Sequence, residues 1–280
     1  MKTGGCHLKK NLQIWTVVIL TLFLFPVIIQ FIPEESKISN SKIIKENALI
    51  VYASNIVEEE VPDEEPEMIV EAEPEQKIGN LLLYFTHSTE AYQPITKNID
   101  GKVAVSHHQT ENVIRMGDKL KAQLDLYGLE TDTFKKAVPY TRAYQDMRPY
   151  VKKRISEKEY DLIIDIHRDS VGPEKTTLVH GTERYAKVAF VVGTDNPNYK
   201  KNEAMTNRLK EEMEKRIPGI TRNVIPKGGA GVDGKYNQDL HPNIILLELG
   251  GIGNTEDELS RTIAVIAESI KEIIDQIEEK

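Results

Sequence analysis

The chain has 280 residues and a formal net charge of −8, but this charge is unevenly distributed: residues 33–78 hold 13 acidic and 4 basic side chains, and residues 1–32 hold three lysines and no acid. Residues 79–280 are therefore nearly neutral and lack the concentrated basic face that nucleic-acid binding needs, so no nucleic-acid partner is expected. The single cysteine, Cys6, excludes an intramolecular disulfide framework and leaves histidines and carboxylates to build any metal site.

The first feature along the chain is a run of 21 uncharged, mostly apolar positions, residues 12–32. At about 1.5 Å per helical residue, this run is long enough to cross a hydrocarbon core of about 30 Å. Lys9 and Lys10 precede it and acidic residues follow it, which predicts that residues 1–11 are cytoplasmic and the remainder is extracytoplasmic. A cleaved signal peptide is the alternative, but the run is long for one and no small-residue cleavage site closes it. We therefore expect a single-pass protein of the cell membrane.

Residues 33–78 are expected to form an extended acidic linker. Ten acids and no basic residue lie between Val57 and Gln76, with three prolines among them. Repulsion between like charges, together with proline, keeps such a segment extended and unfolded. A passive spacer is the simpler interpretation, and a docking segment for a basic partner is the alternative.

Residues 79–280 are predicted to form one α/β domain in which strands and helices alternate. Continuous apolar runs predict buried strands, and apolar residues at helical spacing predict the helices between them. Strands are expected at 81–85, 129–134, 160–166, within 179–193 and at 243–249; helices are expected from Thr110 to Gly128, at 143–155, at 202–216 and after the capping box Thr255–Glu258. This pattern predicts three layers, with a mainly parallel twisted sheet and helices on both of its faces.

Three of the predicted strands carry polar residues suited to metal chemistry at their carboxyl ends. His87 and Glu90 follow the first strand, His167 follows the third, and Glu248 lies near the end of the last. Ligands of open α/β sheets bind outside these ends, so the four side chains are expected to meet. Two histidines and a carboxylate are a donor set for catalytic zinc. Glu248 is then the candidate general acid–base, since burial among apolar residues would raise its pKa.

Each of these residues also has a simpler interpretation. An H-x-x-E pair arises often by chance, His167 could be a hydrogen-bonded strand-end histidine, and Glu248 could pair with a lysine or arginine. Asp165 could orient His167 from behind or serve only the fold. Arg168 could bind a substrate carboxylate or pair with the acidic residue that follows it.

Three other residues near the predicted site complete the set of candidates. Glu111, at the start of the helix after Thr110, is a rival to Glu90 as the acidic ligand. His107 and His108 are expected in a loop that lines the cleft.

Four ordered segments carry a family resemblance: LLLYFTHSTEAYQP, GDKLKAQLDLYGLETD, YDLIIDIHRDS and NIILLELGGIGNTEDEL. Over about residues 79–280 they resemble the stage II sporulation protein P family of endospore-forming bacteria, which has the same anchor and spacer before this region. That family is related to zinc-dependent N-acetylmuramoyl-L-alanine amidases. The resemblance implies hydrolysis of the amide between the lactyl group of muramic acid and L-alanine, which removes stem peptides from peptidoglycan during engulfment.

The resemblance also implies a zinc amidase-like fold, a Zn²⁺ cofactor and roles for particular residues. It places the family's metal histidines on His87 and His167 and its essential glutamate on Glu248. In the broader amidase family the acidic ligand precedes the first helix, which favours Glu111, whereas the H-x-x-E spacing favours Glu90. We expect Glu90 to be the ligand.

The implied setting is the mother-cell membrane, with the domain facing the septal, intermembrane space. The implied partners are peptidoglycan and stage II sporulation proteins D and M. Two alternatives remain: an endopeptidase or carboxypeptidase that acts on stem peptides with the same zinc site, and a non-catalytic domain that binds the wall or a partner.

Overall fold

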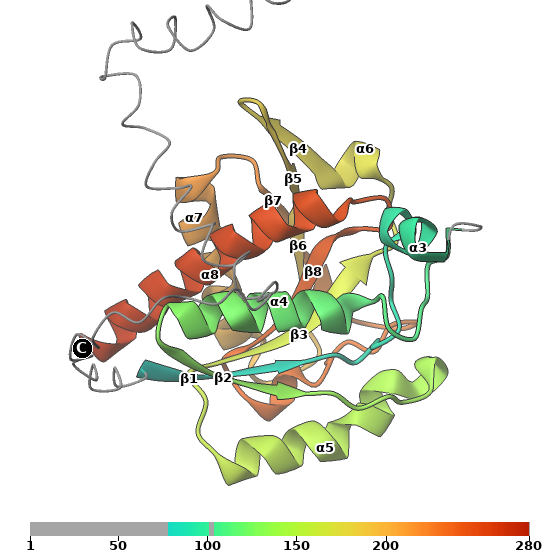
Figure 1. Ribbon diagram of the computed structural model, residues 1–280. Coiled ribbons are helices and arrows are strands. Elements are labelled where there is room, and N and C mark those ends of the chain that lie inside the picture. Colours follow the sequence, from blue (N-terminus) through green and yellow to red (C-terminus); the bar gives the residue numbers. More distant parts are fainter. Residues whose placement is uncertain (1–77, 101–103, 280) are drawn as a thin grey trace, which may run out of the picture. The chain divides into compact units, whose positions relative to one another are not determined.

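The computed structural model of the protein describes residues 78–100 and 104–279 (Figure 1). All of the described residues belong to one compact unit. The predicted cytoplasmic segment, the anchor at 12–32 and nearly all of the acidic linker lie outside the described residues. Within residues 78–100 and 104–279, no helix has both the length and the apolar character needed to cross a membrane.

A six-stranded sheet with the order β2-β1-β3-β8-β6-β7 forms the centre of the domain. Its strands are β1 (Ile78–Tyr84), β2 (Leu129–Phe134), β3 (Leu162–Asp169), β6 (Val188–Gly193), β7 (Thr221–Lys227) and β8 (Ile244–Gly251). Every neighbouring pair is parallel except β6 and β8, which run antiparallel. The prediction of a mainly parallel sheet is therefore confirmed.

The central strands are mostly apolar up to their carboxyl ends because both faces of the sheet are covered. Along β1, Leu81 and Leu83 pack into the larger hydrophobic cluster, whereas Leu82 and Tyr84 pack into a smaller one. This alternation follows from the two-residue period of a strand. The central strands are thus fixed from both sides, which holds their carboxyl ends in place.

Helices cover both faces of the sheet. They are α3 (Gln93–Asp100), α4 (Val113–Leu126), η2 (Tyr140–Arg142), α5 (Ala143–Glu157), α6 (Pro173–Thr176), α7 (Tyr199–Arg216), η3 (Gln238–Leu240) and α8 (Glu256–Glu278). Figure 1 shows α4 and α8 on one side of the sheet and α5 on the other. The larger cluster takes apolar residues from α4, α7 and α8, and the smaller takes Met147 and Val151 from α5. This is the predicted arrangement of three layers.

The stretch 179–193 departs from a simple parallel strand. It divides into part of a hairpin, β4 (Thr177–His180) with β5 (Glu183–Ala186), and then β6. A parallel return to the sheet needs a long crossover, usually a helix. Only the four-residue α6 and the hairpin separate β3 from β6, and β6 accordingly runs antiparallel to its neighbour β8.

The predicted capping box at the start of α8 is present. Thr255 Oγ1 accepts a hydrogen bond from the Glu258 N–H (3.3 Å), and Glu258 Oε2 accepts one from the Thr255 N–H (3.1 Å). Thr255→Ala is expected to lower the free energy of unfolding by about 1 kcal/mol, because it leaves an N-terminal donor of the helix without its partner. Urea unfolding measures this change. A loss no larger than that of Glu278→Ala, an exposed site at the other end of α8, would contradict the expectation.

Candidate metal centre

Three of the predicted site residues meet at the carboxyl ends of β1 and β3. His87 and Glu90 lie in the turn after β1, and His167 lies on β3. One potential ligand atom from each lies within 4.8 Å of the others. His87 Nδ1 is 3.2 Å from Glu90 Oε1, and His167 Nδ1 is 3.6 Å from Glu90 Oε2. The structure thus brings together the two histidines and the carboxylate expected from the sequence.

The spacing of these atoms fits zinc. Zinc holds nitrogen and oxygen ligands at about 2.0–2.2 Å in a tetrahedron, which separates ligand atoms by roughly 3.3–3.5 Å. The separation of His87 Nδ1 from Glu90 Oε1 (3.2 Å) and that of His167 Nδ1 from Glu90 Oε2 (3.6 Å) lie close to that range, and the three potential ligand atoms lie within 4.8 Å of one another. The donor set of two imidazoles and one carboxylate is also that of a catalytic zinc site.

Glu90 is held as a carboxylate inside the protein. Burial would raise its pKa, but the contacts with His167 and His87 and a hydrogen bond from the Arg168 backbone N–H (2.9 Å) outweigh that effect. The pKa of Glu90 is therefore held well below its usual range. A carboxylate that stays charged at this depth is ready to bind a cation.

Asp165 stands behind His167, on the same face of β3. Asp165 Oδ2 lies 3.1 Å from His167 Nε2, on the side of the ring opposite Glu90. Thr86 fixes the aspartate by donating two hydrogen bonds to it, from its N–H (2.9 Å) and its hydroxyl (2.7 Å). Burial would lower the pKa of His167, but the charges of Asp165 and Glu90 raise it well above its ordinary value. Such a partner orients a histidine ligand and increases its basicity.

Glu248 lies on β8 directly beside His167, since the two residues are partners in the β3–β8 register. Its side chain is half-buried, and its Oε2 is buried without a hydrogen-bond partner within the described part of the chain. Burial raises the pKa of Glu248 to about 7, although the neighbouring His167 opposes the shift. A carboxyl group with this pKa can both accept and return a proton near neutral pH.

Arg168 is buried beside the candidate metal centre and does not pair with the Asp169 carboxylate. Its side chain is only 5% exposed, and it donates hydrogen bonds to the backbone carbonyls of Ser106 (3.0 Å) and Asp169 (3.1 Å). The Asp169 carboxylate pairs instead with Arg222 of β7. In this structure the Arg168 guanidinium supports the loop beside Glu90, and a role toward substrate stays a prediction.

The rival ligand Glu111 is occupied elsewhere. Its carboxylate pairs with Arg115 one helical turn later (2.8 Å), and it is not part of the group of potential ligands. His108 accepts hydrogen bonds from the backbone N–H groups of Thr110 (3.3 Å) and Glu111 (2.9 Å). The geometry therefore favours Glu90 over Glu111.

Two tyrosines beside the histidines were not anticipated from the sequence. Tyr140 of η2 stacks on His87 with ring centroids 4.2 Å apart, and Tyr144 of α5 contacts the rings of His87 (5.4 Å) and His167 (6.1 Å). Both residues follow the carboxyl end of β2, at the sheet edge where the ligands lie. That position in PYTRAY was the signal that could have identified them.

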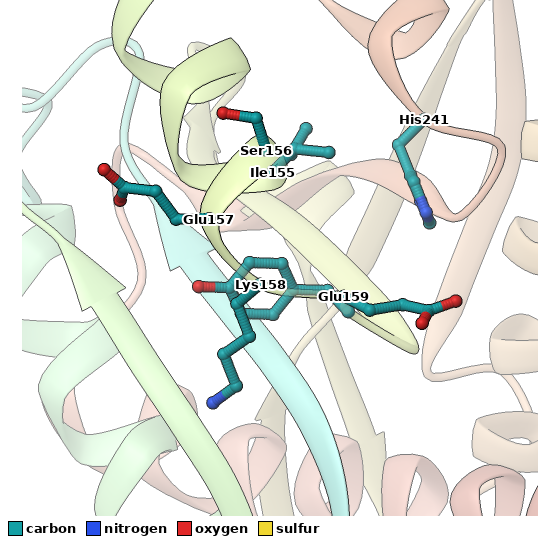
Figure 2. Close-up of a pocket in the computed structure, with 7 residues that line it drawn as sticks. Ile155, Ser156, Glu157, Lys158, Glu159 and His241 are labelled. Atoms are coloured by element: carbon teal, nitrogen blue, oxygen red, sulfur yellow. The ribbon is translucent and has the colours of Figure 1, made fainter.

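A pocket of about 260 Å³ lies elsewhere, at the opposite end of β3 (Figure 2). It is lined by Ile155, Ser156, Glu157, Lys158, Glu159, Tyr160 and His241. Tyr160 precedes β3 and His167 is near its end, so at about 3.3 Å per residue the two regions are roughly 20 Å apart. This pocket contains none of the four predicted zinc-site residues.

The chain is similar to a known protein family. A family model described as stage II sporulation protein P matches residues 28–271. The chain belongs to that family. Stage II sporulation protein P of Bacillus subtilis (strain 168) is 36% identical, over 71% of this chain and 53% of the relative, so the chain spans about half the length of that relative. All four predicted site residues lie within the part that matches the stage II sporulation protein P family.

The chain is also similar to solved structures, but at lower sequence identity. The CwlD amidase from Clostridioides difficile, in complex with the GerS lipoprotein, is 14% identical with a TM-score of 0.47, covering 70% of this chain and 98% of that one. A structure of the putative N-acetylmuramoyl-L-alanine amidase from Neisseria meningitidis is 13% identical with a TM-score of 0.37, covering 71% and 94%. At these scores the site assignment in this member of the stage II sporulation protein P family rests on its own geometry.

The affinity of this site for zinc is expected to fall as pH is lowered from about 8 to about 6, because zinc must displace a proton from His167. The pKa of His167 is raised in the metal-free protein, so the imidazolium persists above its ordinary range and competes increasingly as pH falls. Competition titrations against a chromophoric chelator measure the affinity, and calorimetry in two buffers measures the released proton. An affinity independent of pH, with no proton released, would contradict this account.

Proposed function

We propose that residues 79–280 form a zinc-dependent N-acetylmuramoyl-L-alanine amidase that removes stem peptides from peptidoglycan. The observation that carries this proposal is the convergence of His87, Glu90 and His167 within 4.8 Å, with Glu248 beside them on the next strand. Membership of the stage II sporulation protein P family supports peptidoglycan as the substrate and sporulation engulfment as the setting.

His87, Glu90 and His167 would hold the metal. When bound, zinc supplies a Lewis acid that polarises a carbonyl and makes water more acidic. Asp165 keeps His167 oriented, and Thr86 keeps Asp165 in place. These contacts fix the ligands before substrate arrives, so little reorganisation is needed.

Glu248 is the group that moves the proton. With a pKa of about 7 it is partly ionised at neutral pH, and its carboxylate can accept a proton from the attacking water. It then gives that proton to the nitrogen of L-alanine as the carbon–nitrogen bond of the amide breaks. The products are a free lactyl carboxylate on the glycan and a peptide with a free amino terminus.

The proposed location follows from the amino-terminal sequence and the family. Residues 12–32 would anchor the chain in the mother-cell membrane with residues 1–11 in the cytoplasm, and the acidic linker at 33–78 would let the domain reach the wall in the septal, intermembrane space. Stage II sporulation proteins D and M are the partners that family membership suggests.

Product analysis tests the reaction. The full chain, loaded with zinc and incubated with purified peptidoglycan, is expected to release peptides that begin with L-alanine and to leave intact muramic acid, as read by mass spectrometry. A chelator should stop the release. Peptides that begin at another residue would identify an endopeptidase at the same site, and release of single carboxyl-terminal amino acids would identify a carboxypeptidase. Wall binding without any release would indicate a non-catalytic domain.

A further inference from the structure

Tyr140 is an exposed aromatic residue that contacts the candidate metal centre. One face of its ring stacks on His87, with an interplanar angle of 23° and centroids 4.2 Å apart, yet 57% of the residue is exposed. Tyrosine is enriched at binding interfaces because its ring is apolar and its hydroxyl can hydrogen-bond. The outer side of Tyr140 is therefore available to a ligand whose reacting group lies at the zinc ligands.

His107 stands beside Tyr140 on a backbone that is fixed to the site. His107 and Glu90 pair in an isolated antiparallel β-bridge, and hydrogen bonds flank it, from the Ala91 N–H to Ser106 O (2.9 Å) and from the His108 N–H to Thr89 O (2.9 Å). The His107 ring meets the Tyr140 ring edge-on at 5.8 Å. The two exposed side chains thus form one surface, which we name the Tyr140–His107 ledge.

The Tyr140–His107 ledge carries hydrogen-bonding groups around an aromatic face. His107 Nδ1 lies 3.1 Å from Ser106 Oγ, and among the residues the structure describes neither its Nε2 nor the Tyr140 hydroxyl has a hydrogen-bond partner. Arg142, the cation nearest in sequence to Tyr140, is directed away toward Gln145 (3.2 Å) and Asp146 (3.5 Å). Among the described residues, the Arg168 guanidinium beside Ser106 is buried and donates to backbone carbonyls. A sugar ring offers hydroxyls and a carbon–hydrogen face that suit His107 and Tyr140.

We infer that the Tyr140–His107 ledge binds the muramic acid ring next to the scissile amide, with the ring packed on Tyr140 and a sugar polar group hydrogen-bonded to His107. This inference rests on the proposed amidase function and adds the substrate group that the enzyme recognises. The scissile carbonyl belongs to the lactyl group, which is attached directly to that sugar ring. A sugar packed on Tyr140 would therefore lie close to the candidate ligand His87, which Tyr140 contacts.

A pair of substrates tests the ledge. One is a disaccharide–peptide fragment of peptidoglycan, and the other is a D-lactoyl peptide, which keeps the same amide but lacks the sugar. The full chain is expected to prefer the first, and Tyr140→Ala should lower kcat/KM on it about tenfold, the equivalent of one stacking contact. The same variant should lose clearly less kcat/KM on the D-lactoyl peptide, because only the disaccharide–peptide carries the sugar that the ledge would bind, and it should bind zinc with normal stoichiometry.

Three further variants separate the role of the aromatic ring from that of His107 and from a general effect of losing a tyrosine. Tyr140→Phe keeps the ring and should keep the preference, and His107→Ala should lower activity on the disaccharide–peptide alone. Tyr150→Ala removes another exposed tyrosine, which stacks on Phe134. It should leave kcat/KM unchanged for both substrates. Equal losses on both substrates for Tyr140→Ala, or a wild-type chain without preference, would overturn the inference. A wild-type chain that cleaves neither amide would instead refute the proposed function.

Discussion

Replacing Glu248 with glutamine is expected to slow amide hydrolysis by roughly a thousandfold, the scale of a lost general acid–base. Glutamine keeps the size of the side chain but cannot accept the proton of water or return it to the leaving nitrogen. Glu248 is not one of the three potential ligands, so zinc content should stay at the wild-type level. Release of peptide from peptidoglycan measures the first effect, and elemental analysis of the purified protein measures the second.

Glu111→Gln is the matched control for this variant. The Glu111 carboxylate lies just before α4, pairs with Arg115 and is outside the group of potential ligands. Its activity should therefore remain close to wild type. A Glu248→Gln variant that keeps a tenth or more of the wild-type rate would remove Glu248 from the mechanism and direct attention to another base.

The second large effect is expected from Glu90→Ala, which should abolish tight zinc binding. Glu90 contacts both histidines, and its removal also deprives the Arg168 N–H of its acceptor. A metal present at a thousand times its dissociation constant stabilises a protein by about 4 kcal/mol. Chelation should therefore lower the free energy of unfolding of the wild-type chain by that order and leave Glu90→Ala unchanged.

The comparison with another histidine tests whether this effect is specific. His180 is exposed at the tip of the β4–β5 hairpin, and His180→Ala should keep the full response to zinc and chelator. Thermal unfolding with and without zinc measures the response in each variant. Equal stabilisation of Glu90→Ala and the wild type would show that zinc binds somewhere other than the proposed centre.

Local signals were enough to predict most of the fold. The strand at β2 and the start of α5 match their predicted positions, and Gly128, at a φ of 73°, ends the turn after α4 as expected. β7 was missed because its sequence, TRNVIPK, is largely polar and contains Pro226, which is tolerated at the edge of a sheet. Nothing local to β6 specified its direction, which depends on how the chain returns to the sheet.

The candidate site was predictable where strand ends brought residues together. His167 and Glu248 could be expected to meet because adjacent parallel strands end at the same edge, and the register makes them partners. The choice between Glu90 and Glu111 needed side-chain positions, since only these show Glu111 committed to Arg115. Tyr140 was missed because a single exposed tyrosine in the short 3-10 helix η2 has no periodic pattern, and only its position after β2 pointed to the site.

The most direct test of the metal centre is crystallography of the zinc-loaded protein at the zinc absorption edge. The account predicts one strong anomalous peak bound by His87, Glu90 and His167, with the Glu248 carboxylate nearby but outside the ligand set. An anomalous peak at other residues, or no peak in protein that releases stem peptides, would contradict it.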